Sequence, residues 1–163
     1  MPQFSRPDSD IAANGWLPST GSDLYAMLDE VTASDADYIY LLGDSVSPQS
    51  ELGMSNITDP GVNTGHIFRF RAKKSAAAGH VRRFFAYVLQ APTVIAKLED
   101  FELTENWVDY VIEVASVDAA NITDYSTLKM VFSGVVGDQS DDQERDSLVS
   151  FAEFEVPNAG SGS

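Results

Sequence analysis

The sequence HIFRFRAK at residues 66–73 alternates apolar and basic side chains along most of its length. One series of alternate positions holds His66, Phe68, Phe70 and Ala72. The other series holds Ile67, Arg69, Arg71 and Lys73. Successive side chains of a β-strand point to opposite faces of its sheet, so this period of two predicts a strand with one buried face and one basic, solvated face.

On both sides of this strand, apolar stretches alternate along the chain with groups of turn residues. We expect about eight strands in total, the others lying at residues 37–42, 51–58, 81–90, 94–98, 107–114, 128–133 and 148–156. Their β-branched and aromatic content is typical of strands, and Gly, Pro and Asp separate them. No helix long enough for a parallel crossover is expected between them. The prediction is therefore an all-β fold, a single antiparallel β-sandwich that is jelly-roll-like.

The chain has 163 residues and a mass of 17.7 kDa, which fits one domain. We expect residues 15–157 to form the sandwich. Residues 1–14 are rich in Pro, Ser and Asp, and we expect an extended polar N-terminal arm that is flexible and orders on docking. Residues 158–163 are expected to be a short Gly/Ser tail. Residues 24–31 are compatible with either a helical turn or a strand.

The composition excludes several classes of function. With 0 Cys, the chain has no disulfide, thiol nucleophile or Cys-based zinc site. A formal net charge of -15 argues against partners that are held by Lys and Arg clusters, so we expect no nucleic acid and no membrane. We also expect no membrane span and no secretory signal, because the sequence holds no apolar run of the required kind.

No catalytic motif is present, so we predict that the protein is not an enzyme and has no cofactor. His66 is expected to be a buried residue at the edge of the core, satisfied by a hydrogen bond. Residues 138–146 are rich in carboxylates, which suit Ca²⁺, but this segment lacks the glycine and the spacing of an EF-hand. A solvated hairpin loop is the favoured interpretation, and a Ca²⁺ site is the alternative.

Two sets of residues are candidates for binding. Aromatic side chains at a surface build a sugar-binding platform, although in a sandwich they more often belong to the core. The candidates are Trp16, Trp107, Tyr38, Tyr40 and Tyr110. A basic patch is the second candidate, on the condition that strands 66–73 and 81–90 pair. Its partner-binding residues are Arg69, Arg71, Lys73, Arg82 and Arg83.

Several short stretches between residues 6 and 157 resemble a group of small proteins from tailed-phage and prophage structural gene clusters. These stretches are RPDSDI (6–11), GW (15–16), LYA (24–26), LDE (28–30), DADYI (35–39), DPG (59–61), GH (65–66), RFRAK (69–73), LQ (89–90), VIA (94–96), ITDYSTL (122–128) and VSFAEFEVP (149–157). Residues 137–146 depart from the resemblance by being more acidic than expected.

The resemblance implies a non-enzymatic virion structural protein, made in the bacterial cytoplasm and located in the virion. A head decoration protein on the capsid lattice is the first expectation, with the major capsid protein or other virion proteins as partners. A homo-oligomer is also expected, and a trimer suits a site of threefold symmetry. The alternatives are a head or tail fibre module, and a carbohydrate-binding module for host-surface glycan.

Overall fold

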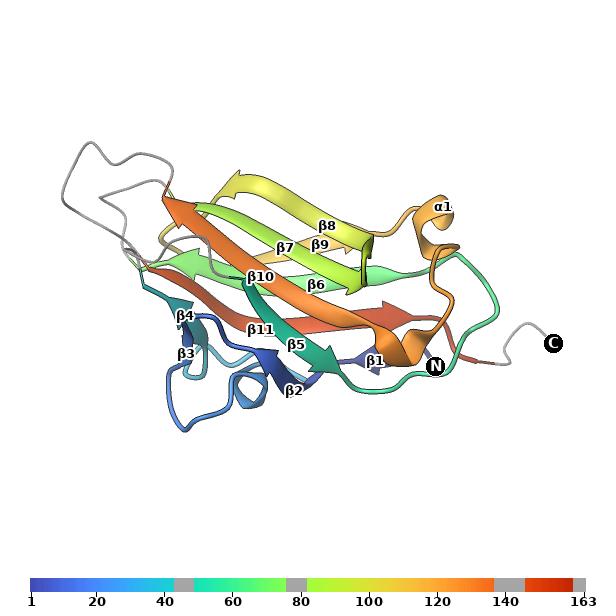
Figure 1. Cartoon of the computed structure of the whole chain (residues 1–163), viewed down its shortest axis with the longest axis horizontal. Helices are drawn as coiled ribbons and strands as arrows, with labels where there is room; N and C mark the ends of the chain where they lie inside the picture. The colour runs from blue at the N-terminus through green and yellow to red at the C-terminus, as the bar shows by residue number, and fades with distance from the viewer. Residues whose placement is uncertain (43–48, 76–81, 137–145, 160–163) are drawn as a thin grey trace.

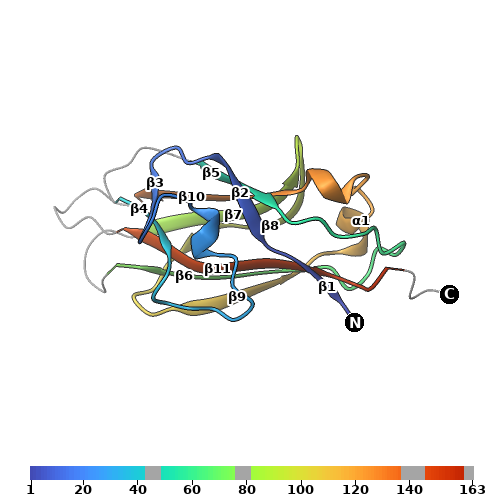
Figure 2. The ribbon, with the colours of Figure 1, turned by 90° about the horizontal axis from the view of Figure 1, so that it is seen from below.

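The computed structural model describes residues 1–42, 49–75, 82–136 and 146–159 and consists of two antiparallel β-sheets packed face to face (Figures 1 and 2). These residues form eleven strands, more than the expected eight. The helical elements are short: η1 (Tyr25–Met27), α1 (Ser116–Ala119) and η2 (Tyr125–Thr127). None of the helices in these ranges is long and apolar enough to cross a membrane.

The six-stranded sheet has the order β3-β4-β11-β6-β9, and β1 pairs with β11 beside this path. Its members are β1 (Gln3–Ser5), β3 (Trp16–Pro18), β4 (Ile39–Leu41), β6 (Ile67–Lys74), β9 (Val108–Glu113) and β11 (Ser147–Val156). The five-stranded sheet has the order β2-β5-β10-β7-β8. Its members are β2 (Pro7–Ala12), β5 (Gln49–Met54), β7 (Arg82–Gln90), β8 (Thr93–Glu102) and β10 (Lys129–Val136).

The connectivity of β4 to β11 confirms the predicted jelly roll. These eight strands divide equally into the sets β4-β11-β6-β9 and β5-β10-β7-β8. The chain passes from one sheet to the other at every connection except that between β7 and β8. This is the two-sheet arrangement of a jelly roll, and β1, β2 and β3 add short strands to it.

The space between the sheets is filled by aromatic side chains. Phe70 of β6 is 1% exposed, and its ring lies 5.0 Å from that of Tyr110 and 5.9 Å from that of Phe132. The burial of β6 alternates from Ile67 to Ala72, as HIFRFRAK predicts, with the phenylalanines inward and the arginines outward. Sheet register is fixed by this alternation, because a shift by one residue would expose the phenylalanines.

The expected N-terminal arm is wrong for the segment that forms β1 and β2. Gln3–Ser5 pairs with β11, and Pro7–Ala12 pairs with β5. Polar composition does not prevent this, because β2 is an edge strand with four consecutive exposed residues and two irregularities in its register. At the other end of the chain, residues 160–163 of the expected tail lie outside the described residues.

One loop crosses the outer face of the six-stranded sheet. Residues 28–38, which connect η1 to β4, pass over this face, as the view from below shows (Figure 2). Asp35 of this loop contacts Arg71 of β6 and Ser150 of β11. The outer face of this sheet is therefore partly covered, and the loop brings further side chains onto it.

Candidate functional site

The structure divides the five aromatic candidates between the core and the surface. Trp16 is 1% exposed and packs its edge against Phe84, and Tyr110 stacks on Phe70 inside the sandwich. Tyr38, Tyr40 and Trp107 are instead half-buried at the surface. The ring of Tyr38 lies 6.1 Å from that of Tyr40 and 6.3 Å from that of Trp107. We call these three residues the surface aromatic cluster.

Three different elements bring the surface aromatic cluster together. Tyr40 points outward from β4 between the buried Ile39 and Leu41. Tyr38 lies at the end of the crossing loop, where Ser19 fixes it: its amide donates to Ser19 Oγ at 3.0 Å, and its carbonyl accepts from Ser19 N at 2.8 Å. Trp107 immediately precedes β9.

A cavity of about 430 Å³ adjoins this cluster. Its described lining residues are Ser19, Tyr38, Tyr40, Ser75, Asp146 and Leu148. Strand pairing sets its floor, because Leu148 of β11 lies opposite both Tyr40 of β4 and Lys73 of β6. The cavity thus combines two aromatic rings with hydroxyl and carboxylate side chains, which is the mixture of apolar surface and polar groups found in small-molecule sites.

Charged groups surround Trp107. The guanidinium of Arg71 lies 5.9 Å and the ammonium of Lys73 lies 5.8 Å from the centroid of its ring. Arg71 also donates to both carboxylate oxygens of Asp35 at 2.8 Å, and its Nη1 donates to Asp109 Oδ1 at 3.2 Å. The hydrogen bond from Arg71 lowers the pKa of Asp35, so this carboxylate stays ionised at neutral pH.

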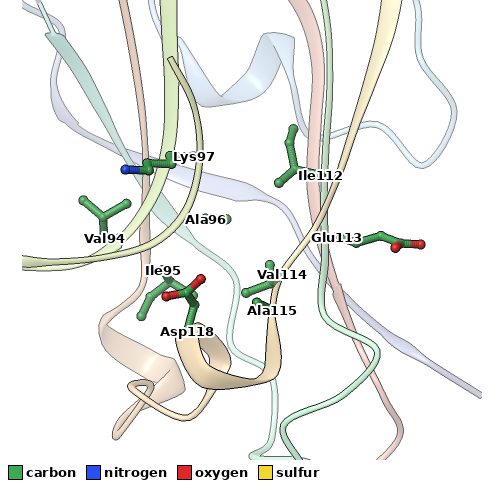
Figure 3. Close-up of a pocket in the computed structure, with 9 residues that line it drawn as sticks. All are labelled: Val94, Ile95, Ala96, Lys97, Ile112, Glu113, Val114, Ala115 and Asp118. Carbon is green, nitrogen blue, oxygen red and sulfur yellow. The ribbon is translucent and has the colours of Figure 1, made fainter.

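Other cavities are less suited to a polar ligand with an apolar face. A cavity of about 260 Å³ opens between the edges of β8 and β9, with mostly aliphatic walls and with Lys97, Glu113 and Asp118 also lining it (Figure 3). Its described lining holds no aromatic residue. A polar cavity of about 410 Å³ near η2 includes Tyr125, but that ring is 8% exposed. Neither cavity presents an exposed ring for stacking from its described residues.

The predicted basic patch does not form, because β6 and β7 belong to different sheets. Arg69, Arg71 and Lys73 lie on the outer face of the six-stranded sheet. Arg83 lies on the five-stranded sheet, where its guanidinium pairs with Asp100. Arg82 begins β7, and its side chain lies outside the described part of the structure. The alternation of side chains along one strand indicates which residues share a face, but it does not indicate which of the two sheets the strand joins.

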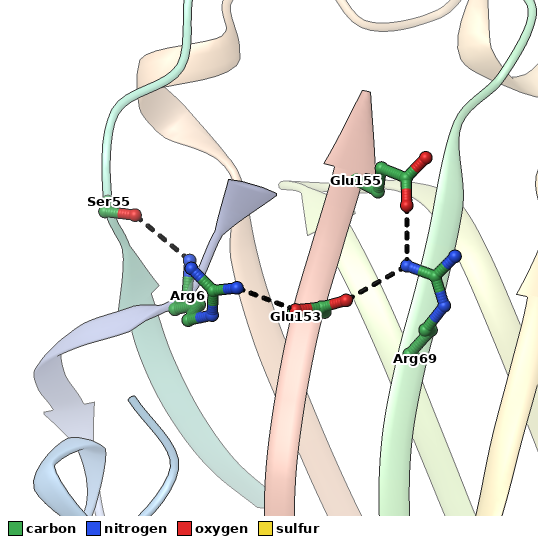
Figure 4. A network of polar contacts seen from close by, with 5 residues as sticks. All are labelled: Arg6, Ser55, Arg69, Glu153 and Glu155. Atoms are coloured by element: carbon green, nitrogen blue, oxygen red, sulfur yellow. Dashed lines mark hydrogen bonds and ion pairs between the residues drawn. The ribbon is translucent and has the colours of Figure 1, made fainter. Parts of the chain in front are cut away.

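Arg69 belongs to an ion-pair network that ties the N-terminus to the sandwich (Figure 4). Arg69 Nη1 lies 3.0 Å from Glu153 and 2.8 Å from Glu155. Arg6 donates to the other oxygen of Glu153 at 3.0 Å, and the amide of Arg6 donates to Ser55 Oγ at 3.0 Å. Glu153 is 6% exposed, so its charge is compensated inside the protein by two arginines.

His66 is buried and hydrogen-bonded, as predicted. It is 1% exposed, with Nδ1 3.0 Å from the Thr64 carbonyl and Nε2 2.8 Å from the Tyr125 hydroxyl. A carbonyl only accepts, so Nδ1 carries the proton and Nε2 accepts from Tyr125. Burial lowers the pKa of His66 and, with Asp59 nearby, raises the pKa of Tyr125 to about 12.

This histidine makes stability depend on pH. The unfolded imidazole takes up a proton below its ordinary pKa of about 6.5, whereas the folded one resists it. The free energy of unfolding is therefore expected to fall as the pH drops below about 6.5 towards the lowered pKa of the folded state. Urea titrations at pH 7.5 and pH 5.5 measure this loss, and His66→Gln is expected to reduce it. An equal loss in the variant would contradict the assignment.

The other predicted ligand sites are not formed by described residues. Residues 138–145 of the acidic segment lie outside the described ranges. In the remaining chain, no three His, Asp or Glu side chains are grouped closely enough to hold a metal ion. The Ca²⁺ alternative for residues 138–146 therefore stays a prediction.

Comparisons with known proteins establish the fold but no family. No protein-family model matches the chain, and no curated protein matches its sequence. Among solved structures, the chain is similar to SGBP-B from a complex xyloglucan utilization locus in Bacteroides uniformis. The TM-score is 0.54 at 10% identity, and the match covers 94% of this chain. The chain spans about half of that protein, 47% of its length.

Two other structures are less similar. The K1 cleaved adhesin domain of Lys-gingipain from Porphyromonas gingivalis W83 has a TM-score of 0.48 at 10% identity, with 96% of this chain and 99% of that one covered. A CBM4 structure has a TM-score of 0.43 at 18% identity, with 85% and 91% covered. The similarity to SGBP-B, at a TM-score of 0.54, agrees with the β-sandwich architecture. The expected phage resemblance, virion location and capsid partners stay predictions.

Proposed function

We propose that this domain is a carbohydrate-binding module that holds a glycan at the surface aromatic cluster. The observation that carries the proposal is the position of Tyr38 and Tyr40, whose neighbouring rings line a cavity of about 430 Å³ together with Ser19, Ser75 and Asp146. A pyranose ring has apolar C–H faces and a rim of hydroxyl groups. Tyrosine rings offer apolar surface to the faces, and the polar side chains offer hydrogen bonds to the rim.

The ligand is an uncharged glycan. The protein carries a formal net charge of -15, and Asp146 lies in the wall of the cavity. A field of this sign disfavours polyanions such as uronate or sulfated polymers, whereas neutral hydroxyls bind through local contacts that the net charge affects little. Arg71 does not reverse this preference, because Asp35 and Asp109 both pair with its guanidinium.

The fold supports the same proposal, although it does not specify a ligand. SGBP-B, which shares the sandwich at a TM-score of 0.54, comes from a xyloglucan utilization locus. Jelly rolls also include lectin domains, and the fold hosts unrelated functions, so the local geometry carries the argument. Xyloglucan oligosaccharide is the first neutral ligand to test, followed by an array of other neutral glycans.

Replacing either tyrosine is expected to weaken binding strongly. Tyr38→Ala and Tyr40→Ala each remove a ring from the cavity wall, and the dissociation constant is expected to rise at least about tenfold, or about 1.4 kcal/mol. Isothermal titration calorimetry with the best ligand from the array measures this change. Tyr87→Ala is the matched control, because Tyr87 is a half-buried tyrosine on the outer face of the other sheet.

The control variant is expected to bind within about twofold of the native protein, because Tyr87 contacts Glu99 and not the cluster. Equal losses in all three variants would indicate unfolding, which circular dichroism would reveal. Glycan binding that survives both tyrosine substitutions would place the ligand elsewhere. A native protein that binds no neutral glycan would reject the proposal. The virion prediction would then be tested by counting copies in purified particles.

A further inference from the structure

We propose that Arg71 is a positioning residue that latches the crossing loop, residues 28–38, to the sheet and thereby sets the spacing of the surface aromatic cluster. The expected effect on glycan affinity rests on the proposed function. The contacts that hold the loop exist without a ligand. We call the contacts among Arg71, Asp35 and Ser150 the Arg71 latch.

The loop has two anchors that hold Tyr38 in place. At its end, the Tyr38 amide donates to the Ser19 hydroxyl, and the Tyr38 carbonyl accepts from the Ser19 amide. Three residues earlier, Asp35 binds the sheet through both of its carboxylate oxygens. Arg71 Nε and Nη2 each donate to one oxygen at 2.8 Å, which is the bidentate geometry that only a guanidinium provides.

The second anchor, at Asp35, also includes Ser150, which lies at an irregularity in β11. The pairing of β11 with β6 shifts in register between Val149 and Phe151, so Ser150 is an extra residue at this point. Bulges of this kind re-aim a side chain. The Ser150 hydroxyl donates to Asp35 Oδ1 at 2.9 Å, and Ser150 itself is 0% exposed. Two neighbouring strands therefore offer donors to one loop carboxylate.

Arg71 links the two sides of the cluster. Through Asp35 it fixes the loop that carries Tyr38, and through its position 5.9 Å from the ring centroid it also contacts Trp107. Its Nη1 additionally donates to Asp109 of β9, two residues after Trp107. One guanidinium thus contacts both segments whose aromatic rings lie 6.3 Å apart, and it fixes the distance between them.

The test compares two arginines of the same strand. Arg71→Lys keeps the charge but loses the bidentate fork, and it is expected to raise the glycan dissociation constant about tenfold. Arg69→Lys is the matched control: Arg69 lies on the same face with a similarly exposed side chain, 29% against 23%, but it pairs with Glu153 and Glu155. We expect this control to bind within about twofold of the native protein.

Two ligand-free measurements separate the latch from the proposed function. In Arg71→Lys, hydrogen exchange of residues 28–38 and acrylamide quenching of Trp107 fluorescence are expected to increase. Trp16, the other tryptophan, is 1% exposed. A variant that keeps Trp16 as its single tryptophan gives the reference signal for quenching of a buried ring. If the native protein binds no glycan but these two signals change, the proposed function fails and the latch stands.

A double-mutant cycle provides the final check. Asp35→Asn with Arg71→Lys is expected to lose no more affinity than the more damaging single variant, because both substitutions break one unit. Fully additive losses of affinity in the double variant would overturn the inference. So would an Arg71→Lys variant whose hydrogen exchange, fluorescence quenching and glycan affinity match those of Arg69→Lys.

Discussion

Deletion of residues 1–12 is expected to lower the melting temperature by more than about 10 °C, and it removes a part of the fold rather than a dispensable arm. β1 pairs with β11 at three register positions, and β2 pairs with β5 at four. Each intramolecular hydrogen bond contributes about 0.5–1.5 kcal/mol net. Together these losses are a substantial fraction of the roughly 5–15 kcal/mol that typically stabilises a domain.

The deletion also removes hydrogen-bond partners from one buried and one partly buried polar group. Glu153, which is 6% exposed, loses Arg6 as the partner of one oxygen, and the Ser55 carbonyl loses the hydroxyl of Ser5. An unsatisfied buried acceptor costs about 1–3 kcal/mol. The network in Figure 4 would then hold Glu153 through Arg69 alone.

Deletion of residues 1–2 is the control for this experiment. Met1 and Pro2 precede β1, and Met1 is 97% exposed, so the melting temperature should stay within about 2 °C of the native value. Differential scanning calorimetry on both deletions measures the contrast. A native melting temperature after deletion of residues 1–12 would restore the interpretation of this segment as an arm.

The strands of the sandwich were predictable because a strand with one buried face alternates apolar and polar residues in the sequence. The period of two in HIFRFRAK placed Phe68 and Phe70 on the buried face of a strand, where the structure has them. The jelly roll followed from the number of strands and the lack of long helices. The sequence of β2 shows no such alternation, because a strand at a sheet edge with exposed residues needs no apolar face.

The candidate site was predictable only in part. Tyr38, Tyr40 and Trp107 were among the aromatic candidates, but no local pattern indicates that Tyr38 and Trp107 lie close together. Their proximity depends on the crossing loop, which Asp35 attaches to Arg71. The error about Arg83 has the same origin: alternation indicates the face of a strand, whereas the sheet that the strand joins depends on the order of connections.

Phe70→Ala is expected to lower the free energy of unfolding by about 3–5 kcal/mol, the usual cost of removing a buried phenylalanine ring. Phe70 is 1% exposed and lies at the centre of the aromatic core. Its ring is within 6.2 Å of five others, those of Phe68, Phe84, Phe101, Tyr110 and Phe132. These rings come from both sheets, so no single side chain can move to fill the cavity without disturbing the packing between the sheets.

Two substitutions isolate the effect of this cavity. Phe70→Leu keeps most of the volume and is expected to cost less than Phe70→Ala. Phe151→Ala removes a ring from the outer face of the same sheet, opposite Arg71, and is expected to cost less than about 1.5 kcal/mol because that ring is half-buried. Guanidinium titrations measure all three variants. A loss below about 1 kcal/mol for Phe70→Ala would mean that the sheets repack, and that the ring cluster does not fix their distance.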